Sequence, residues 1–195
     1  MEFSGKKVTV VGTGISGIGA VGLLNAVGAE VVLYDGNEKL KIEDIEKKLG
    51  TYKAEIVLGE LTKELTDSSD LLVISPGVPI DSPVVKAFEA AGVPVWGEVE
   101  LAYAFDKGKV LAITGTNGKT TTTALVGQIV GAYHKDTFVV GNIGNPYTTE
   151  VLKSNKDSYT VAEISSFQLE TVHEFHPLVS AILNITPDHL NRHYT

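Results

Sequence analysis

The chain has 195 residues, of which 24 are acidic and 16 are basic, so its formal net charge is −8. This length allows one large α/β domain or two small ones. The acidic balance and the lack of a basic stripe argue against an extended nucleic-acid interface, and the absence of cysteine excludes disulfides and thiolate metal sites.

The apolar runs have the length of strands, as in residues 8–11 and 71–74, and are too short to cross a bilayer. The N-terminus shows neither the long apolar stretch nor the cleavage site of a signal peptide. We therefore expect a cytoplasmic protein without membrane insertion, and we expect it to be a monomer.

Strands and helices alternate along the first half of the chain. Apolar runs predict strands at residues 7–12, 29–35, 54–59, 70–77 and 93–97. Apolar residues at helical spacing predict helices at residues 17–27, 39–50 and 82–91. Regular alternation of this kind predicts an α/β fold with a Rossmann-like, doubly wound parallel sheet, which we assign to residues 1–97.

A second unit is predicted for residues 98–195. It opens with a connecting helix at residues 98–105 and continues with strands at 107–115, 137–142, 159–165 and 179–186. Further helices are predicted to begin at Lys119 and to span residues 167–175. We interpret this unit as a truncated α/β domain of the P-loop ATPase type, because the chain stops at "DHLNRHYT" with no closing element.

A glycine-bearing loop, Gly-Thr-Asn-Gly-Lys-Thr, lies between a predicted strand and a predicted helix at residues 115–120. Glycines let backbone N–H groups face phosphate oxygens, and the helix N-terminus adds a positive dipole end. The spacing is shorter than the usual P-loop, yet Lys119 can neutralise phosphate charge and Thr120 can bind Mg²⁺. A glycine turn with a chance lysine is the alternative. The residues expected to bind ATP are Gly115, Thr116, Asn117, Gly118, Lys119, Thr120 and Thr121.

An earlier loop, Gly12-Thr-Gly-Ile-Ser-Gly17, joins the first predicted strand to the first predicted helix. Asp35 ends the next strand, where dinucleotide-binding folds keep the acid that binds ribose. Taken alone, this pattern fits NAD binding and also fits a tight turn without any ligand.

Five segments together resemble the Mur ligases, a family of ATP-dependent enzymes that form amide bonds in peptidoglycan synthesis. They are "ISPGVPIDSP" (74–83), "GTNGKTTT" (115–122), "GNIG" (141–144), "EISSFQLE" (163–170) and "NITPDHLNRH" (184–193). The form "SSFQLE" is similar to the branch of the family that adds D-glutamate to UDP-N-acetylmuramoyl-L-alanine.

The resemblance implies that the first loop holds the UDP-linked sugar, not NAD, and that the second holds ATP. It places Gly14, Ile15 and Ser16 at the UDP phosphates and Asp35, Gly36, Ser75, Pro76 and Gly77 near the uridine. It places Asn142 and Gln168 at the muramoyl part of the substrate and Ser165 and Ser166 near the phosphates.

Glu163 ends a predicted strand at the same crevice as the ATP loop, where an acid can bind the Mg²⁺ of ATP together with Thr120. The alternative is a surface carboxylate. His189 and His193 are four residues apart, a spacing that also fits two ligands of a transition metal. No third ligand lies at a suitable spacing. The resemblance instead makes His189 a ligand of a second Mg²⁺ and gives Lys119, Glu163 and His189 catalytic roles.

The activity implied by the resemblance begins with transfer of the ATP γ-phosphoryl group to the substrate carboxylate. The amine of D-glutamate then attacks this acyl phosphate. An NAD-linked oxidoreductase and a regulatory ATP-binding module are the competing hypotheses. We expect the 195-residue chain itself to be inactive, because it lacks the third domain of the family and a carbamylated lysine that bridges two Mg²⁺ ions. His173 and His176 are interpreted as the surface of a helix.

Overall fold

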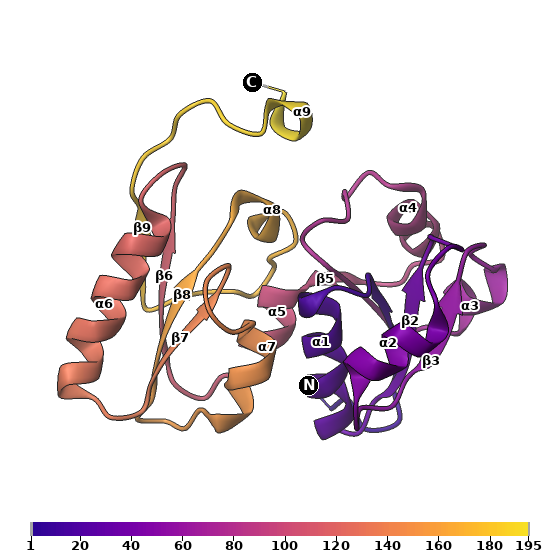
Figure 1. Cartoon of the computed structure of the whole chain (residues 1–195), viewed down its shortest axis with the longest axis horizontal. Coiled ribbons are helices and arrows are strands. Elements are labelled where there is room, and N and C mark those ends of the chain that lie inside the picture. Colours follow the sequence, from indigo (N-terminus) through magenta and orange to yellow (C-terminus); the bar gives the residue numbers. More distant parts are fainter. Residues whose placement is uncertain (1, 195) are drawn as a thin grey trace.

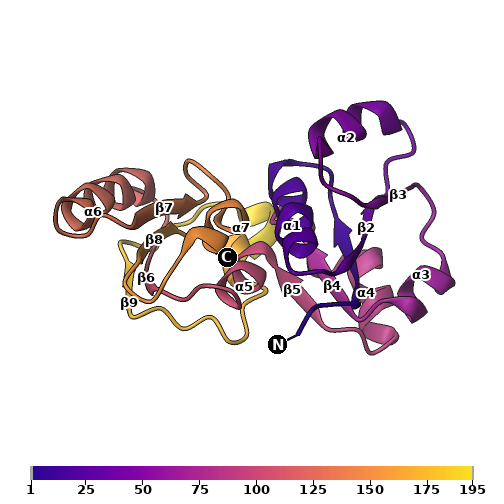
Figure 2. The same ribbon diagram turned by 90° about the horizontal axis from the view of Figure 1, so that it is seen from below.

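The computed structural model describes residues 2–194 of the chain and shows two lobes, each built on its own parallel sheet. Figures 1 and 2 show the lobes side by side, with α1, α5 and α7 between them. The expectation of a mixed α/β protein with parallel sheets is confirmed.

The first lobe holds a five-stranded sheet in the order β3-β2-β1-β4-β5, and every pair of neighbouring strands is parallel. Four of the five residues of its central strand, β1, are buried, as expected of a strand covered on both faces. The strands are β1 (Lys7–Val11), β2 (Glu30–Asp35), β3 (Glu55–Leu58), β4 (Leu71–Ile74) and β5 (Val95–Gly97). The helices are α1 (Ile15–Ala26), α2 (Ile42–Leu49), α3 (Lys63–Ser68) and α4 (Pro83–Ala90).

The second lobe holds a four-stranded parallel sheet in the order β7-β8-β6-β9. Its strands are β6 (Lys109–Thr114), β7 (Thr137–Gly141), β8 (Tyr159–Glu163) and β9 (Val179–Ile182). Its helices are α5 (Glu98–Tyr103), α6 (Lys119–Tyr133), α7 (Tyr147–Glu150), α8 (Ser166–Leu169) and α9 (Leu190–His193), with a 3₁₀ turn at Val151–Lys153.

One buried apolar cluster runs through both lobes. It includes Leu24 of α1, Leu101 of α5, Val110 of β6 and Tyr147 of α7, and the last of these is fully buried. A separate cluster covers the other face of the first sheet, under α3 and α4. Because burying one such side chain stabilises a fold by about 1.5–3 kcal/mol, the shared cluster holds the lobes against each other.

Both glycine-rich loops follow a central strand, the first after β1 and the second after β6. In each sheet the strand order changes direction beside that strand, so the carboxyl ends of the strands open a crevice there. The topology therefore places the two loops at the ligand-binding edges of their sheets.

The structure differs from the predicted elements in the second lobe. The predicted helix at residues 167–175 ends at Leu169, and the interpretation of His173 and His176 as a helix surface is wrong. The backbone N–H groups of His173, Glu174 and Phe175 instead donate to the buried carboxylate of Glu100. These N–H groups bond to a carboxylate and so cannot form the backbone hydrogen bonds of a helix, which explains why the helix ends early.

Short helices were also missing from the prediction, namely α3, α7 and α9. None of the helices in residues 2–194 combines the length and the apolar character needed to cross a membrane.

Candidate nucleotide and substrate site

The second glycine-rich loop has the backbone of a phosphate cradle. Gly118 lies at φ 83° and caps α6, which begins at Lys119, and Gly115 lies at φ 137°. Both angles lie in the region that glycine adopts at little cost. The Lys119 ammonium donates to the carbonyl oxygens of Gly115 (2.7 Å) and Thr116 (3.0 Å), so it lies over the loop. Thr120 and Thr121 follow in the exposed first turn of α6.

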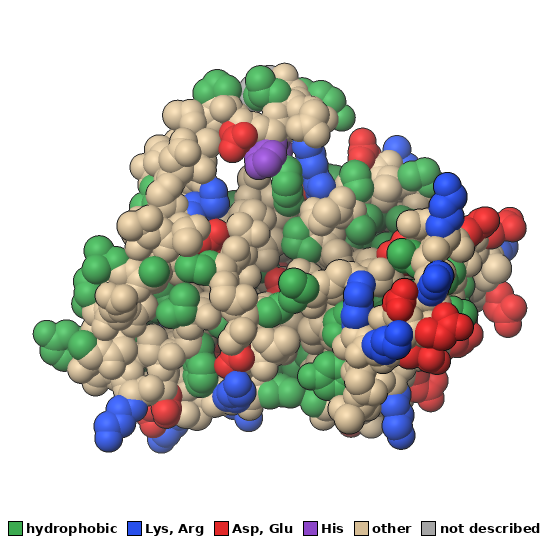
Figure 3. All heavy atoms as spheres, in the orientation of Figure 1, with side chains coloured by type: hydrophobic (Ala, Val, Ile, Leu, Met, Phe, Trp, Pro, Cys, Tyr) green, Lys and Arg blue, Asp and Glu red, His purple; other side chains and the backbone are tan. Residues whose placement is uncertain are grey.

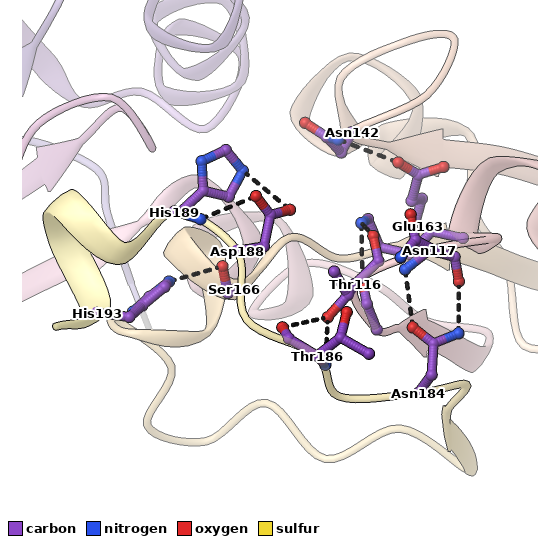
Figure 4. A network of polar contacts seen from close by, with 12 residues as sticks. Thr116, Asn117, Asn142, Glu163, Ser166, Asn184, Thr186, Asp188, His189 and His193 are labelled. Atoms are coloured by element: carbon purple, nitrogen blue, oxygen red, sulfur yellow. Dashed lines mark hydrogen bonds and ion pairs between the residues drawn. The ribbon is translucent and has the colours of Figure 1, made fainter. Parts of the chain in front are cut away.

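The segment after β9 holds this loop by two reciprocal pairs of hydrogen bonds (Figure 4). The Asn184 amide accepts from the Asn117 N–H and donates to the Asn117 carbonyl, both at 2.9 Å. The Thr116 hydroxyl donates to the Thr186 carbonyl (3.1 Å) and accepts from the Thr186 N–H (3.0 Å). These contacts fix the peptide groups of a loop that is shorter than the usual P-loop.

Glu163, at the end of β8, is a buried acid with one carboxylate oxygen engaged. Its Oε1 atom accepts from the Asn142 side-chain amide at 3.0 Å, as Figure 4 shows. Its Oε2 atom is buried and has no hydrogen-bond partner within residues 2–194. A buried carboxylate oxygen without a donor costs free energy unless a cation or proton satisfies it. Glu163 therefore fits an Mg²⁺ ion, which prefers carboxylate and hydroxyl oxygens together with phosphates.

His189 and His193 both pack against Phe167. The ring centroid of Phe167 is 4.9 Å from that of His189 and 5.4 Å from that of His193. The His193 Nε2 atom is 2.9 Å from the Ser166 hydroxyl, while His189 pairs with the neighbouring Asp188 (Figure 4). Within the described residues no three histidine or acidic side chains come together as a metal-binding group. The geometry therefore gives no support to a transition-metal pair.

His189 itself has a left-handed backbone, with φ 48° and ψ 41°, and it starts α9. This conformation is uncommon for a residue with a side chain. Its backbone N–H donates to the Asp188 carboxylate at 2.8 Å, which stabilises the turn. His189 lines a cleft between the lobes.

A cleft of about 590 Å³ brings many of the predicted site residues together. Figure 3 shows the C-terminal segment arching over this hollow. The predicted residues that line it are Pro76 and Gly77 from the first lobe and Gly115, Thr116, Lys119, Asn142, Ser165, Ser166 and His189 from the second. Glu163 is attached to its wall through Asn142.

The first glycine-rich loop is shaped so that its backbone approaches the strand ends closely. A Cβ atom at Gly17 would lie 1.9 Å from the Gly12 carbonyl, whereas one at Gly14 would meet nothing within 4 Å. Gly14 caps α1, and no side chain occupies that cap. The Ser75 hydroxyl faces the loop and is buried without a partner among the described residues. An open helix N-terminus beside an unpartnered hydroxyl fits an anionic ligand.

Asp35 ends β2 and faces the same loop. One carboxylate oxygen accepts from the backbone N–H (3.3 Å) and the hydroxyl (3.1 Å) of Thr13, and the other accepts from the Asn37 N–H (3.1 Å). Gly36 follows directly. Gly14 and Ile15 line a separate cavity of about 600 Å³ against the second lobe, so the two loops do not share one pocket.

Gln168 faces the interior instead of the cleft. Its carbonyl oxygen accepts from the backbone N–H and hydroxyl of Ser165, and its amide nitrogen donates to Glu98 at 3.2 Å. Glu98 also accepts from the N–H of Thr148 at 3.1 Å. Burial raises the pKa of Glu98, while the bonds from Thr148 and Gln168 act in the opposite direction. Gln168 therefore supports the Ser165 turn from behind.

The prediction missed Glu98 and Glu100, both of which are buried in α5. The signal was present, since "EVELAY" places two acids in an apolar helix, where each requires a partner. It also missed the roles of Asn184, Thr186 and Arg192, whose partners are distant in the sequence.

Comparison with known sequence families gives matches over both lobes. The N-terminal domain described as "Mur ligase MurD-like" matches residues 6–97, and the "Mur ligase middle domain" matches residues 113–195. The chain belongs to the Mur ligase family.

Curated Mur ligase relatives cover the whole chain. A protein of Lachnospira eligens, named UDP-N-acetylmuramoylalanine--D-glutamate ligase, is 72% identical over 195 residues. A protein of the same name from Lachnoclostridium phytofermentans is 60% identical over 196 residues. In both cases the match includes 100% of this chain and 43% of the relative, so the chain spans less than half the length of these relatives.

Solved Mur ligase structures share the fold. A UDP-N-acetylmuramate:L-alanyl-gamma-D-glutamyl-meso-diaminopimelate ligase from Neisseria meningitides matches 97% of this chain and 63% of its own, with a TM-score of 0.57 and 18% identity. A murein peptide ligase from Psychrobacter arcticus matches 96% of this chain and 44% of its own, with a TM-score of 0.55 and 19% identity. At these identities the likeness concerns the fold alone.

Proposed function

We propose that the chain supplies the UDP-substrate and ATP sites of a ligase that adds D-glutamate to UDP-N-acetylmuramoyl-L-alanine, in a cytoplasmic step of peptidoglycan synthesis. The observation that carries the proposal is the cleft in which the ATP-type loop, Asn142 and His189 face the 76–77 turn of the other lobe. The names of the relatives that are 72% and 60% identical agree with it.

In this proposal the ATP phosphates lie on the loop at residues 115–121, with the Lys119 ammonium moving from its loop carbonyls to the phosphate oxygens. Thr120 and Glu163 would hold Mg²⁺, and His189 a second ion. Bound Mg²⁺ supplies neutralisation of the charge that gathers on the phosphate oxygens. The UDP diphosphate lies on Gly14, Ile15 and Ser16 at the start of α1.

The reaction we propose has two steps. A substrate carboxylate oxygen attacks the γ-phosphorus of ATP, the bond to the ADP oxygen breaks, and an acyl phosphate forms. The amine of D-glutamate then attacks the carbonyl carbon, phosphate leaves with the electron pair, and the nitrogen loses a proton. This chain's residues act by holding the carboxylate and the γ-phosphoryl group close together and by neutralising their negative charge.

Separate titrations of the 195-residue chain with UDP-N-acetylmuramoyl-L-alanine, Mg-ATP and NAD test the proposal. We expect saturable binding of the first two ligands and none of NAD. Replacing Lys119 by Met should weaken ATP binding by about tenfold or more while UDP-substrate binding persists, because the lysine ammonium bonds to carbonyls of the second loop. Binding of NAD without binding of the UDP-sugar would overturn the proposal and favour an oxidoreductase.

A further inference from the structure

Arg192 of α9 joins the second lobe to the first. Its guanidinium donates to the carbonyl oxygens of Pro76 (3.2 Å) and Val78 (3.3 Å), which lie 116 and 114 residues away in the sequence. The same group forms an ion pair with the Glu170 carboxylate, with a second bond from its Nε atom at 3.2 Å. In Figure 1, α9 stands at the end of the C-terminal arch, beside the loop that leads from β4 to α4.

The Arg192 contacts hold the two lobes in one arrangement. The side chains of Arg192 and Glu170 are only 15% and 18% exposed, so solvent screens the pair less than it would a surface salt bridge. The guanidinium also lies 4.5 Å from the centroid of the Phe167 ring, a stacking arrangement that arginine favours. A planar donor group with partners on three sides has little freedom to move.

The Arg192 contacts hold two parts of the candidate substrate site, the turn at Gly77 and the turn at His189. Pro76 and Val78 flank Gly77, and the Val78 N–H closes a turn onto the Ser75 carbonyl at 2.9 Å. On the other side, the Arg192 N–H donates to the His189 carbonyl at 2.9 Å, so the anchor lies one helical turn from His189. Gly77 and His189 line the same cleft from different lobes.

We propose that Arg192 is a positioning residue that sets the first-lobe substrate turn against the cleft of the second lobe. The inference rests on the proposed function, because the ligand it concerns is the UDP-linked sugar acid. Such a ligand must lie with its diphosphate on the first loop and its carboxylate in the cleft. Arg192 therefore affects the affinity for the complete substrate, which spans both lobes, more strongly than the affinity for UDP, which contacts only the first-lobe side of this turn.

Calorimetric titration of the 195-residue chain and its Arg192→Ala variant with UDP, and with UDP-N-acetylmuramoyl-L-alanine, tests this. We expect the variant to bind the complete substrate about tenfold or more weakly than the wild type and UDP no more than about threefold more weakly, since a preorganised site loses affinity when its parts move freely. Arg192→Lys should recover only part of the loss, because lysine cannot pair bidentately. Lys63→Ala, which removes an exposed cation of α3, is the matched control.

A second readout does not depend on the ligand. Hydrogen exchange at the Val78 amide should accelerate in the Arg192→Ala variant and stay unchanged in the Lys63→Ala control. Equal losses for UDP and the complete substrate, or no loss for either, would overturn the positioning role. If the wild type binds neither ligand, the proposed function is wrong, whatever the role of Arg192. An unchanged exchange rate at Val78 in the variant would show that Arg192 does not hold the turn.

Discussion

Glu163 shows how one atom can indicate a ligand. Its Oε2 atom is buried without a hydrogen-bond partner among the described residues, and its side chain belongs to the fully buried set. Replacing it by Gln keeps the shape and removes the charge. We expect the metal-free Glu163→Gln variant to unfold with a free energy about 1–2 kcal/mol higher than that of the wild type, because an unpaired buried amide costs less than an unpaired carboxylate.

The same substitution should abolish the strengthening of ATP binding by Mg²⁺. Urea unfolding without metal and ATP titration with and without Mg²⁺ measure the two effects. Glu60→Gln, which changes an exposed acid, is the control and should alter neither. A variant that is less stable than the wild type and still responds to Mg²⁺ would mean that Glu163 holds no cation.

At the scale of single elements, the conformation of the first loop requires a glycine at position 17 but not at position 14. A methyl group at Gly17 would overlap the Gly12 carbonyl, while Gly14 has open space and a φ of −81° that any residue can adopt. We expect Gly17→Ala to lower the free energy of unfolding by about 2–3 kcal/mol and Gly14→Ala to change it by less than about 0.5 kcal/mol. Urea denaturation of both variants measures this, and similar stabilities for the two would contradict the close approach.

The connecting helix α5 makes stability depend on pH through Glu98. Burial raises its folded pKa above the ordinary value of 4.5, so the folded state holds this proton to higher pH than the unfolded state. The contribution of Glu98 to stability is therefore largest below pH 4.5, and it declines as pH rises from there through the raised folded pKa.

The Glu98→Gln variant lacks this titration. We expect the free energy of unfolding of the wild type, relative to that of the variant, to fall as pH rises above about 4.5. Unfolding of both proteins at a series of pH values measures the difference. A difference that grows in favour of the wild type with pH would show that the bonds from Thr148 and Gln168 outweigh burial.

The elements that sequence patterns predicted are those whose causes are local. Strands β1 and β6 are apolar runs, Gly118 and Lys119 mark the start of α6, and Glu163 stands at the end of its strand. The early end of α8 has a distant cause, because the Glu100 carboxylate that binds the N–H of His173 lies 73 residues earlier. Patterns along a sequence contain no such pairing.

The same limit applies to the site. Glycine spacing and the lysine identified the second loop. The hydrogen bond from the Asn117 N–H to Asn184, which holds this loop, joins residues 67 positions apart. Gln168 belongs to a motif of the predicted site, yet its side chain is buried and bonds to Glu98. Sequence reasoning locates the loops, and tertiary packing decides which side chains face the cleft.

At the scale of the whole molecule, the second lobe exposes large apolar side chains on two of its elements, α6 and β9. On α6, Leu125 and Ile129 are each 54% exposed, and on the edge strand β9, Ile182 is 65% exposed. Figure 3 shows hydrophobic side chains gathered on the side of the molecule where α6 lies. Exposed apolar side chains favour binding or association, and an edge strand adds to that tendency.

We expect this surface to bind a hydrophobic dye such as anilinonaphthalene sulfonate, because its side chains are accessible without unfolding. Replacing Ile129 and Ile182 together by Lys should reduce the dye fluorescence by more than half and change the free energy of unfolding by less than about 0.5 kcal/mol, since neither side chain is buried. Ile42→Lys on α2, at one of the exposed isoleucines of the first lobe (47%), is the matched control. Undiminished fluorescence in the double variant would place the dye elsewhere, and a large loss of stability would mean that both isoleucines pack in solution.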